Sequence, residues 1–349
     1  MSRLPLRRVL HVVDRVTGGV PVAVRTYIRH SPEGYRHTIA SPFVDGVPAP
    51  VWGELEADHL DWDTSTPARA AQSLRRLRRR HPLDVVHAHS SFPGAYVRTL
   101  RWPSGVRVVY TPHCFAFSRT DVGVGKRALF RGIEAALAGR AIVAACGAGE
   151  RRQAVAVGVP EGRSLVIPNV ASWERTGEPL ALSLQGIDGR LRIGMLGRWA
   201  AQKDPDYFLR CVDDLRRALP SIHVAPTWIG DGETAAPQDI RVTGWLSSTG
   251  VRAELRALDL YLHTAAWEGF PIALLDAHAT GLPILARAIP ALACLPPALT
   301  IEEGMPSLVA AIENGRFPEW RASNRGEWAR YLGPRDAAAQ RRALAEAWA

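Results

Sequence analysis

The sequence predicts an α/β protein with two domains, and three observations support this. Short apolar runs alternate with amphipathic segments along most of the chain, a pattern typical of parallel sheets covered by helices. A chain of 349 residues is long enough for two domains of ordinary size. Residues 169–189 mix Pro, Gly, Ser and Glu without clear periodicity, which indicates a linker. We therefore expect domains over 1–170 and 171–334, followed by a C-terminal helix over 335–349, with packing of that helix on the first domain as one option.

The first domain is expected to begin with a strand over 8–13 and to continue in strand–helix order. Its further strands are expected over 38–41, 84–89, 106–111, 141–145 and 164–167. Its helices are expected over 21–29, 69–80 and 126–137, and from Gly149 onward. In the second domain, strands over 191–195 and 222–229 flank a helix over 206–218. The pattern weakens after Ile289, until the C-terminal helix.

The segment 259–286 predicts a strand, a loop, a helix and a second strand. Pro271 suits the first turn of the helix, and Gly281 suits its end. The helix start leaves three N–H groups without helical partners, those of Phe270, Ile272 and Ala273. They lie at the carboxyl end of a strand, where open α/β sheets bind their ligands, so the segment predicts an anion site.

Two carboxylates flank this anion site, Glu268 in the loop and Asp276 inside the helix. A helix interior disfavours Asp, so Asp276 needs another reason to be there. The segment contains Glu268-Gly269-Phe270-Pro271, followed by Asp276-Ala277, Ala279, Gly281 and Pro283.

This spacing resembles the E-x7-E signature of retaining glycosyltransferases of family 4. The resemblance implies the B-type fold, in which two Rossmann-like domains face each other across a cleft. The first domain would then lie on the acceptor side, and the second would bind the nucleotide-sugar donor. The sequence departs from the signature at Pro271, where the family has Gly, and at Asp276, where Glu is usual. The alternative is an ordinary βαβ unit with two solvated carboxylates.

The segment 197–204 follows a strand and precedes a helix, and it contains Arg198 and Lys203. Arg can clamp a phosphate with two hydrogen bonds, and Lys acts as a compact point charge. Lys203 and Lys126 are the only lysines among 43 basic residues. The family has a similar G-R-x4-K phrase that binds the donor diphosphate, so the resemblance gives Arg198 and Lys203 that role. A solvated basic loop is the alternative.

Three weaker segments also resemble the family. Gly18 and Gly19 follow the first strand, where a backbone without side chains can approach a phosphate closely. The segment 229–233 contains a Gly-Asp-Gly turn, although such turns are common in all proteins. The segment 241–245 matches the family's stretch near the nucleobase, which places Val242 and Gly244 there.

Three histidines lie at expected strand ends. The resemblance places His113 near the reacting carbon of the donor sugar, where it would bind the sugar or orient the acceptor. A strand-end histidine that caps a backbone group is the alternative. We expect His87 to be structural and His89 to reach the acceptor cleft.

The formal charge of +9 and the pI of about 9.9 favour anionic partners, such as phosphate esters, acidic glycans or an anionic membrane. No nucleic-acid motif accompanies this charge, so nucleic acid is not an expected partner. The basic helix over 69–80 is either a solvated face or a patch that holds the protein on anionic lipid, near a lipid-linked acceptor.

Compartment and metal content are predicted from the cysteines and apolar runs. The four cysteines are widely spaced without a CxxC pair, which indicates a reduced, cytoplasmic setting and no metal knuckle. The apolar run at 9–13 is too short for a signal peptide, and no stretch reaches the length of a membrane span. We expect a cytoplasmic protein, with association to the inner face of the membrane as an option.

Together these features predict a metal-independent, retaining glycosyltransferase with a nucleotide-diphosphate sugar as donor substrate and no cofactor. The acceptor hydroxyl is expected on a glycan, a lipid-linked sugar or a small-molecule glycoside. In this reading Glu268 binds sugar hydroxyls and Asp276 binds the ribose hydroxyls. The predicted catalytic residues are His113, Glu268, Arg198 and Lys203. The predicted donor-binding residues are Gly18, Gly19, Arg198, Lys203, Val242, Gly244, Glu268, Gly269, Phe270, Pro271, Ile272 and Asp276.

The alternatives are a sugar-nucleotide epimerase or phosphorylase of the same fold, or a catalytically silent partner that binds nucleotide or glycan. The silent partner gains support from residues 288–294, which replace the glycine-rich loop usual in the family.

Overall fold

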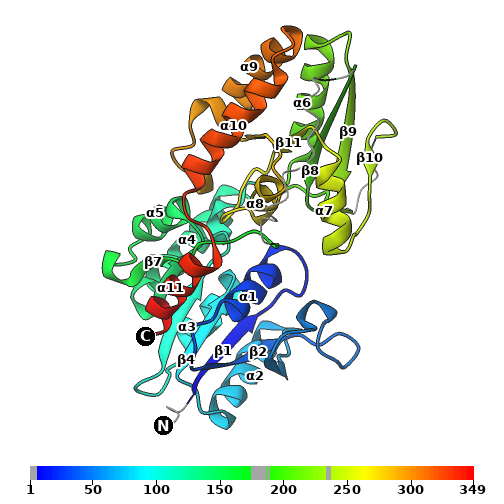
Figure 1. Cartoon of the computed structure of the whole chain (residues 1–349). Helices are drawn as coiled ribbons and strands as arrows, with labels where there is room; N and C mark the ends of the chain where they lie inside the picture. Colours follow the sequence, from blue (N-terminus) through cyan, green and yellow to red (C-terminus); the bar gives the residue numbers. More distant parts are fainter. Residues whose placement is uncertain (1–5, 174–186, 188, 233–236) are drawn as a thin grey trace. The chain divides into compact units, whose positions relative to one another are not determined.

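The computed structural model of the protein describes residues 6–173, 187, 189–232 and 237–349 (Figure 1). The chain divides into two compact units. The first unit comprises Met1–Val170, Glu268–Phe270 and Arg335–Ala349, and the second comprises Ala171–Trp267 and Pro271–Pro334. Most of the expected linker lies outside the described residues, as does Glu233 of the expected turn.

The first unit is built on a seven-stranded parallel sheet with the strand order β3-β2-β1-β4-β5-β6-β7. The strands are β1 (Arg7–Val13), β2 (Tyr35–Ser41), β3 (Ala57–Asp61), β4 (Val85–His89), β5 (Arg107–Thr111), β6 (Ile142–Ala145) and β7 (Ser164–Val166). Because the paired strands all run parallel, their carboxyl ends meet at one edge of the sheet. Any ligand site of the first unit is expected at that edge.

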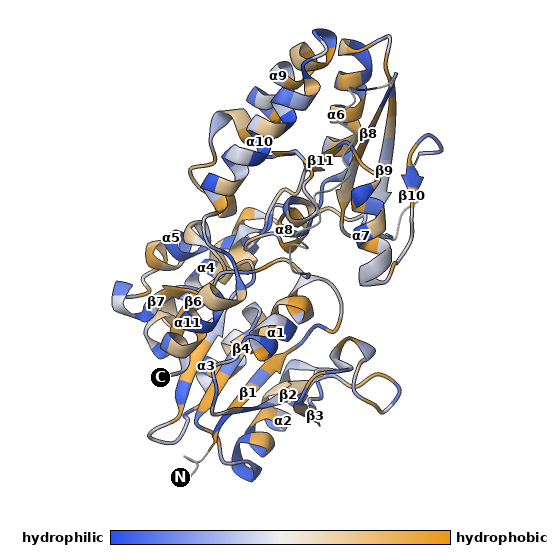
Figure 2. Cartoon of the chain, in the orientation of Figure 1, coloured by the Kyte–Doolittle hydropathy of each residue, from blue (hydrophilic) through white to orange (hydrophobic). Residues whose placement is uncertain are grey.

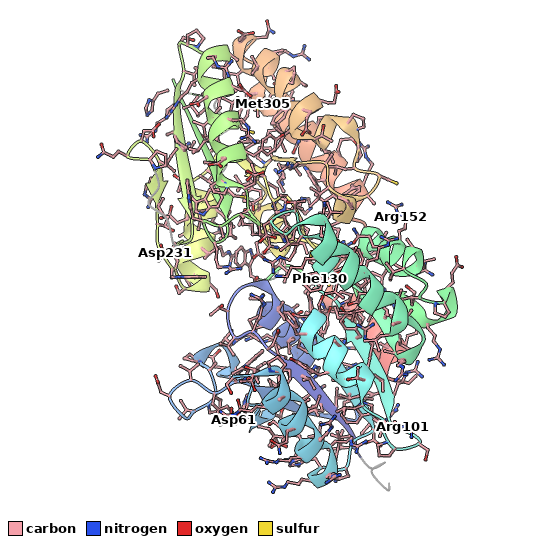
Figure 3. All side chains as sticks on the ribbon, turned by 180° about the vertical axis from the view of Figure 1, so that it is seen from behind. Asp61, Arg101, Phe130, Arg152, Asp231 and Met305 are labelled. Carbon is pink, nitrogen blue, oxygen red and sulfur yellow. The ribbon has the colours of Figure 1, made fainter. Side chains whose placement is uncertain are left out.

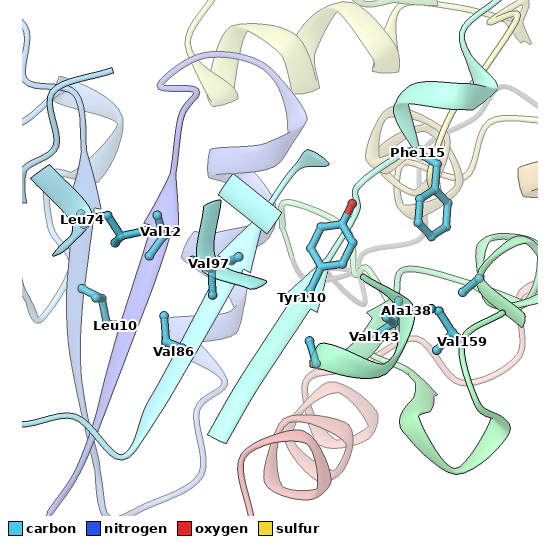
Figure 4. Packing of buried hydrophobic residues seen from close by; sticks show 14 of the residues in the cluster. Leu10, Val12, Leu74, Val86, Val97, Tyr110, Phe115, Ala138, Val143 and Val159 are labelled. Carbon is cyan, nitrogen blue, oxygen red and sulfur yellow. The ribbon is translucent and has the colours of Figure 1, made fainter. Parts of the chain in front are cut away.

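Helices cover both faces of this sheet. They are α1 (Gly19–Arg29), α2 (Pro67–Arg80), α3 (Ser91–Thr99), α4 (Val124–Ala136), α5 (Ala148–Ala156) and α11 (Ala337–Trp348). Alternate residues of β1 divide the core: Val9 packs with Tyr27 of α1 and Trp348 of α11, whereas Leu10 packs with Leu74 of α2 on the other face. Figure 4 shows this second cluster around Leu10 and Leu74.

Helix α2 ends at Arg80 as predicted and begins at Pro67, two residues before the predicted start. Its N-cap Thr66 accepts a hydrogen bond from the N–H of Arg69 at 3.2 Å, and Pro67 occupies the first turn. Only Ala70 and Leu74 are buried, so most of the arginines face solvent, and Figure 2 shows strongly hydrophilic residues at the end of the helix. Three arginines in the last turn interact favourably with the helix dipole.

The second unit contains a five-stranded parallel sheet with the order β10-β9-β8-β11-β12. Its strands are β8 (Arg190–Leu196), β9 (His223–Ile229), β10 (Arg241–Val242), β11 (Leu260–His263) and β12 (Ile284–Ala286). Its helices are α6 (Pro205–Ala218), α7 (Ser248–Arg256), α8 (Ile272–Ala279), α9 (Ile301–Glu313) and α10 (Phe317–Leu332). The prediction of two parallel α/β sheets is confirmed. None of the helices in the described ranges is long and apolar enough to cross a membrane.

Six elements were not predicted from the sequence, namely β3, β10, α3, α7, α9 and α10. Strand β3 lies at the sheet edge, and its sequence Ala-Asp-His-Leu-Asp lacks the apolar content of a buried strand. Helix α9 contains Gly304 and Pro306, which interrupt the helical pattern. Its start carried a signal nonetheless, because Thr300 and Glu303 have the spacing of a capping box, and Thr300 accepts the N–H of Glu303 at 3.2 Å.

Candidate active site

The loop after β8, residues 197–203 and here called the phosphate loop, holds both predicted phosphate ligands of the second unit. Arg198 is exposed and Lys203 is half-buried. Gly197 has φ 151°, and a Cβ at this position would lie 2.7 Å from Cε of Lys203. The lysine stem therefore lies directly against this glycine, so a larger residue would displace it.

The phosphate loop is bonded to the loop after β11, residues 264–267, also in the second unit. Thr264 Oγ1 donates to the carbonyl of Lys203 at 2.8 Å, and the N–H of Ala266 donates to the carbonyl of Gln202 at 2.9 Å. The two loops follow neighbouring strands of the sheet, β8 and β11. The basic pair of the phosphate loop and the chain leading to α8 are therefore held together at the carboxyl edge of the sheet.

The Gly-Asp-Gly turn after β9 packs tightly against the phosphate loop, and Figure 3 shows Asp231 of this turn. A Cβ on Gly230, where φ is 137°, would lie 2.2 Å from the Gly197 carbonyl oxygen. A Cβ on Gly232 would lie 2.3 Å from Cβ of Trp199. Both glycines are thus required by packing, which supports a structural role for the turn.

The predicted nucleobase segment carries exposed apolar side chains. Val242 is 36 % exposed and Trp245 is 62 % exposed. Thr243 between them accepts a hydrogen bond from the N–H of Gly230 at 3.1 Å, which ties the segment to the Gly-Asp-Gly turn. Gly244 has φ 71°, a conformation that favours glycine. An exposed aromatic ring beside the predicted phosphate site could stack on a base.

Helix α8 begins one residue later than the sequence predicts. Pro271 is the N-cap with φ −74°, and Ile272 is the first helical residue. No described side chain caps this end, so the first N–H groups of the helix are oriented for an anion at this point. These N–H groups belong to Ile272, Ala273 and Leu274. The predicted N–H of Phe270 is not among them, and Phe270 belongs to the first unit.

Asp276 lies on α8 and is 5 % exposed. One carboxylate oxygen accepts the N–H of Ser172 at 2.6 Å, and the other accepts the Ser172 hydroxyl at 2.9 Å. Burial raises the pKa of Asp276 from 3.8 to about 7, although the two bonds from Ser172 oppose this rise. Both oxygens therefore already have a partner inside the second unit.

The raised pKa of Asp276 predicts a pH-dependent stability. The folded state holds a proton that the unfolded chain releases near pH 4, so the free energy of unfolding should fall as pH rises from about 4 to about 7. An Asn at this position can accept the N–H of Ser172 and donate to its hydroxyl, but it does not titrate. Between pH 4 and 8, the free energy of unfolding of the wild type, measured by urea denaturation, is expected to fall by up to about 4 kcal/mol more than that of Asp276→Asn. Parallel pH curves for the two proteins would contradict this expectation.

In the first unit, the glycine pair lies at the carboxyl end of β1. Gly18 has φ 83°, and Gly19 is the first residue of α1. No described atom lies within 4 Å of a Cβ built on either glycine, so backbone conformation rather than crowding favours Gly18. Asp14 precedes this loop, and burial raises its pKa to about 6, although the charge of Arg15 and a hydrogen bond from Ser90 oppose this rise. Asp14 was not among the predicted site residues.

The segment Glu268–Phe270 groups with the first unit. Glu268 is half-buried. A Cβ on Gly269 would lie 2.6 Å from the backbone nitrogen of Cys114 and 2.7 Å from the carbonyl carbon of His113. The glycine of the signature therefore allows the backbone to pass directly over the turn at 113–114.

His113 and Cys114 form a turn with two consecutive left-handed residues, with φ 51° and 101°. Such strain persists only where the surroundings hold it, and it is typical of functional sites. The Glu150 carboxylate holds the turn by accepting the N–H of Cys114 at 2.7 Å and that of Cys146 at 2.7 Å. His113 Nε2 lies 3.0 Å from His89 Nδ1, and its Nδ1 lies 3.4 Å from Cys146 Sγ. Desolvation of the His113 ring lowers its pKa to about 3, so the ring is neutral.

The structure places the two other predicted histidines in the core. His89 is fully buried, and both of its ring nitrogens contact other histidines. We therefore revise its expected contact with an acceptor to a supporting contact with His113. His87 is structural as predicted, because its nitrogens are bonded to Thr111 Oγ1 at 2.8 Å and to Trp348 Nε1 at 3.2 Å.

Two family models match consecutive parts of the chain. The model described as a glycosyl transferase 4-like domain matches residues 7–170, and the model described as glycosyl transferases group 1 matches residues 190–314. These matches cover the two sheets and the loops described above. The fold and the loops define a glycosyltransferase of the B-type fold. More specifically, the chain belongs to the family 4 glycosyltransferases.

Two curated relatives are similar to the chain. It is 25 % identical over 244 residues to an uncharacterised 41.2 kDa protein in the cps region of Klebsiella pneumoniae, and this match covers 66 % of each chain. It is 28 % identical over 245 residues to the UDP-Gal:alpha-D-GlcNAc-diphosphoundecaprenol alpha-1,3-galactosyltransferase of Escherichia coli. This match covers 64 % of this chain and 62 % of the relative. The chain thus spans slightly less than two thirds of the length of these relatives.

Solved structures share the fold along nearly the whole chain. HepE of Anabaena, in complex with UDP and glucose, matches with a TM-score of 0.71 and 14 % identity, covering 97 % of this chain and 98 % of that one. Sucrose-phosphate synthase from Thermosynechococcus elongatus matches with a TM-score of 0.67 and 12 % identity, covering 93 % and 96 %. At such low identity these structures establish the fold alone.

Proposed function

We propose that the protein is a retaining glycosyltransferase that moves a hexose from a nucleotide-diphosphate sugar to a hydroxyl acceptor. The bonded pair of loops in the second unit carries this proposal. Thr264 and Ala266 fix the backbone of the loop that bears Lys203, next to the chain that leads into α8. A lysine, an exposed arginine and a helix N-terminus at one sheet edge form a positively charged cradle that suits a diphosphate.

The chemistry proposed for this cradle is stabilisation of the leaving group. Cleavage of the sugar–phosphate bond places negative charge on the nucleoside diphosphate, and preorganised positive groups lower the barrier to that step. Arg198 would contact the diphosphate from the solvent side and Lys203 from the loop interior. The first N–H groups of α8, at Ile272 and Ala273, would add their dipoles. This set supplies the positive field that a metal ion provides in other enzymes, so we propose a metal-independent reaction.

The donor is proposed to be a UDP-hexose. The Escherichia coli relative is named for UDP-Gal, and HepE was crystallised with UDP and glucose. The base would stack at the exposed segment of Val242, Gly244 and Trp245. Asp276 is proposed to meet the ribose hydroxyls through a rearrangement of its bonds to Ser172.

Four residues of the first unit are proposed to serve the sugar and the phosphates. Glu268 would bind sugar hydroxyls, His113 would orient the sugar or the acceptor, and Gly18 and Gly19 would admit a phosphate to the backbone. The left-handed turn at 113–114 supports this assignment, since strained backbone of this kind gathers at functional sites.

The acceptor is proposed to be a sugar linked through diphosphate to a lipid, as in the name of the Escherichia coli relative. Helix α2 supports this proposal, because its exposed arginines offer contacts for anionic lipid. A hollow of about 580 Å³ lies between residues 78–84 and 102–106, where it is lined by Arg78, Arg79, Arg80 and Trp102. We propose that this patch places the protein against the cytoplasmic face of a membrane.

Binding of a nucleotide panel tests the proposed function. UDP, GDP, TDP and ADP would each be titrated into the protein by calorimetry, and UDP is expected to bind most tightly. Preference for another base would be compatible with the proposed transferase function but would overturn the proposal of a UDP-hexose donor. Absence of binding by all four nucleotides would contradict the proposed function.

Treatment with a chelator tests metal independence. Because Arg198, Lys203 and the α8 N-terminus carry the positive charge in this proposal, EDTA is expected to leave turnover of the donor nearly unchanged. A matched sample with added Mg²⁺ serves as the control. Loss of turnover that only Mg²⁺ or Mn²⁺ restores would contradict the prediction.

A further inference from the structure

Four histidines of the first unit form a continuous chain of ring contacts, here called the histidine relay: His113, His89, His11 and His37. His113 Nε2 lies 3.0 Å from His89 Nδ1, His89 Nε2 lies 3.0 Å from His11 Nδ1, and His11 Nε2 lies 3.1 Å from His37 Nδ1. Three of the rings belong to neighbouring strands, β2, β1 and β4, and point to the sheet face covered by α1 and α11. The relay runs from the turn at 113–114 into the interior.

All four rings are neutral, which restricts their hydrogen bonds. Burial lowers the pKa of His37 to about 4 and that of His113 to about 3, and it lowers the pKa of His11 and His89 well below the usual value. A neutral imidazole carries one N–H donor and one bare acceptor nitrogen. Each link of the relay needs one donor and one acceptor, so the four N–H groups must all point in the same direction along the chain. Either every Nδ1 donates or every Nε2 donates.

The ends of the relay distinguish the two directions. At one end, His113 Nδ1 lies 3.4 Å from Cys146 Sγ, and the sulfur of a neutral thiol can accept a hydrogen bond. If Nδ1 of His113 carries the proton, this N–H therefore has an acceptor. At the other end, His37 Nε2 is buried and has no hydrogen-bond partner among the residues that the structure describes. If this nitrogen carried the proton, a buried donor would be left unsatisfied.

We propose that the groups at its two ends orient the relay, so that His37, His11, His89 and His113 all carry their proton on Nδ1. In this arrangement His113 donates to Cys146 and accepts from His89, so the relay residues act as positioning residues for the turn at 113–114. The Glu150 carboxyl group accepts the N–H groups of Cys114 and Cys146. Glu150 thus fixes the backbone of the turn, and Cys146 contacts the ring of His113.

His87 provides an internal comparison. The indole N–H of Trp348 can only donate, so His87 Nδ1 must accept it and Nε2 must carry the proton that is shared with Thr111. His87 is therefore expected to be the opposite tautomer from its neighbours in the same core.

The main rival interpretation is a metal centre, because ligand nitrogens of His11, His87 and His89 lie within 4.8 Å of one another. The hydrogen bonds argue against it. Both nitrogens of His87 are bonded to Thr111 and Trp348, and His11 and His89 share a contact of 3.0 Å that leaves no room for an ion between those two atoms. A metal would have to replace these bonds.

The experiment is ¹⁵N NMR of histidine-labelled protein at neutral pH, with resonances assigned by single substitution. Long-range ¹H–¹⁵N spectra distinguish a protonated ring nitrogen from a bare one. We expect Nδ1–H for the four relay residues, Nε2–H for His87, and substoichiometric metal by elemental analysis. Nε2–H at His113, a charged relay ring or one equivalent of bound metal would each overturn the proposal.

Two substitutions of Cys146 test what orients the relay. Cys146→Ser keeps a hydroxyl that can accept from His113, so it is expected to retain the wild-type shifts. Cys146→Ala removes the link, so both nitrogens of His113 are expected to shift toward values averaged over the two tautomers. Unchanged shifts in Cys146→Ala would overturn the orienting role of Cys146. The relay matters to catalysis only if the proposed function of His113 is correct, but these spectra require no substrate and test the relay independently.

Discussion

Replacement of Arg198 and Lys203 by alanine, each alone, is expected to weaken the binding of a nucleoside diphosphate by about 10- to 150-fold. Each proposed contact would join a charged side chain to a charged phosphate, and such hydrogen bonds contribute about 1.5–3 kcal/mol. The double variant is expected to bind more weakly than either single variant, although the two losses need not add, since both groups would contact the same diphosphate. Calorimetric titration with UDP measures the effect.

The chain offers matched controls for both substitutions. Lys126→Ala removes the other lysine, which lies on α4 in the first unit. Arg190→Ala removes an exposed arginine at the opposite end of β8 from the phosphate loop. Both controls are expected to bind UDP as wild type does. If the folded double variant also bound like wild type, the assignment of the phosphate loop would be wrong.

Arg98→Met is expected to destabilise the first unit by about 3–5 kcal/mol. Arg98 and Glu134 form a fully buried ion pair of 2.9 Å, and the hydroxyl of Tyr110 donates to the same carboxylate at 3.0 Å. The Arg98 guanidinium also lies 4.1 Å from the centre of the Tyr110 ring. Loss of the arginine leaves a buried carboxylate without its counter-charge, which is the costly way to break such a pair. Urea denaturation measures the effect.

The double substitution Arg98→Met with Glu134→Gln separates lost charge from lost packing. It removes both charges, so it is expected to recover much of the stability lost in Arg98→Met. Arg36→Met breaks an exposed pair with Asp58 and is expected to cost at most about 1 kcal/mol. A loss below 1 kcal/mol for Arg98→Met would contradict the account of this pair.

Local sequence signals explain why the fold class and much of the second unit could be predicted. The strand, loop and helix around Pro271 are marked by an apolar run, a proline and a terminal glycine, all close together in the sequence. Arg198 and Lys203 follow an apolar strand directly, so their place at the carboxyl edge of the sheet follows from the strand alone. Boundaries were less accurate, since α8 begins at Ile272 and the N–H of Phe270 does not belong to it.

The contacts that were missed depend on strand order, which the sequence does not show. His11 and His37 meet because β1 lies between β2 and β4 in the sheet, and no local pattern reveals that order. Period-two alternation does place His87 and His89 on the same face of β4. The contact of Ser172 with Asp276 joins residues 104 positions apart, so the reason for an aspartate inside α8 became visible only in the structure.

The most direct test of the central claim is a transfer assay with UDP-galactose and an acceptor carrying GlcNAc on a polyprenyl diphosphate. We expect release of UDP together with a product heavier by one hexose, with the anomeric configuration of the donor retained. Lys126→Ala should form this product at the wild-type rate, and Lys203→Ala should form it far more slowly. If the folded protein neither released nucleotide nor transferred sugar from any UDP-, GDP-, TDP- or ADP-hexose, the claim that this chain is an active glycosyltransferase would be contradicted.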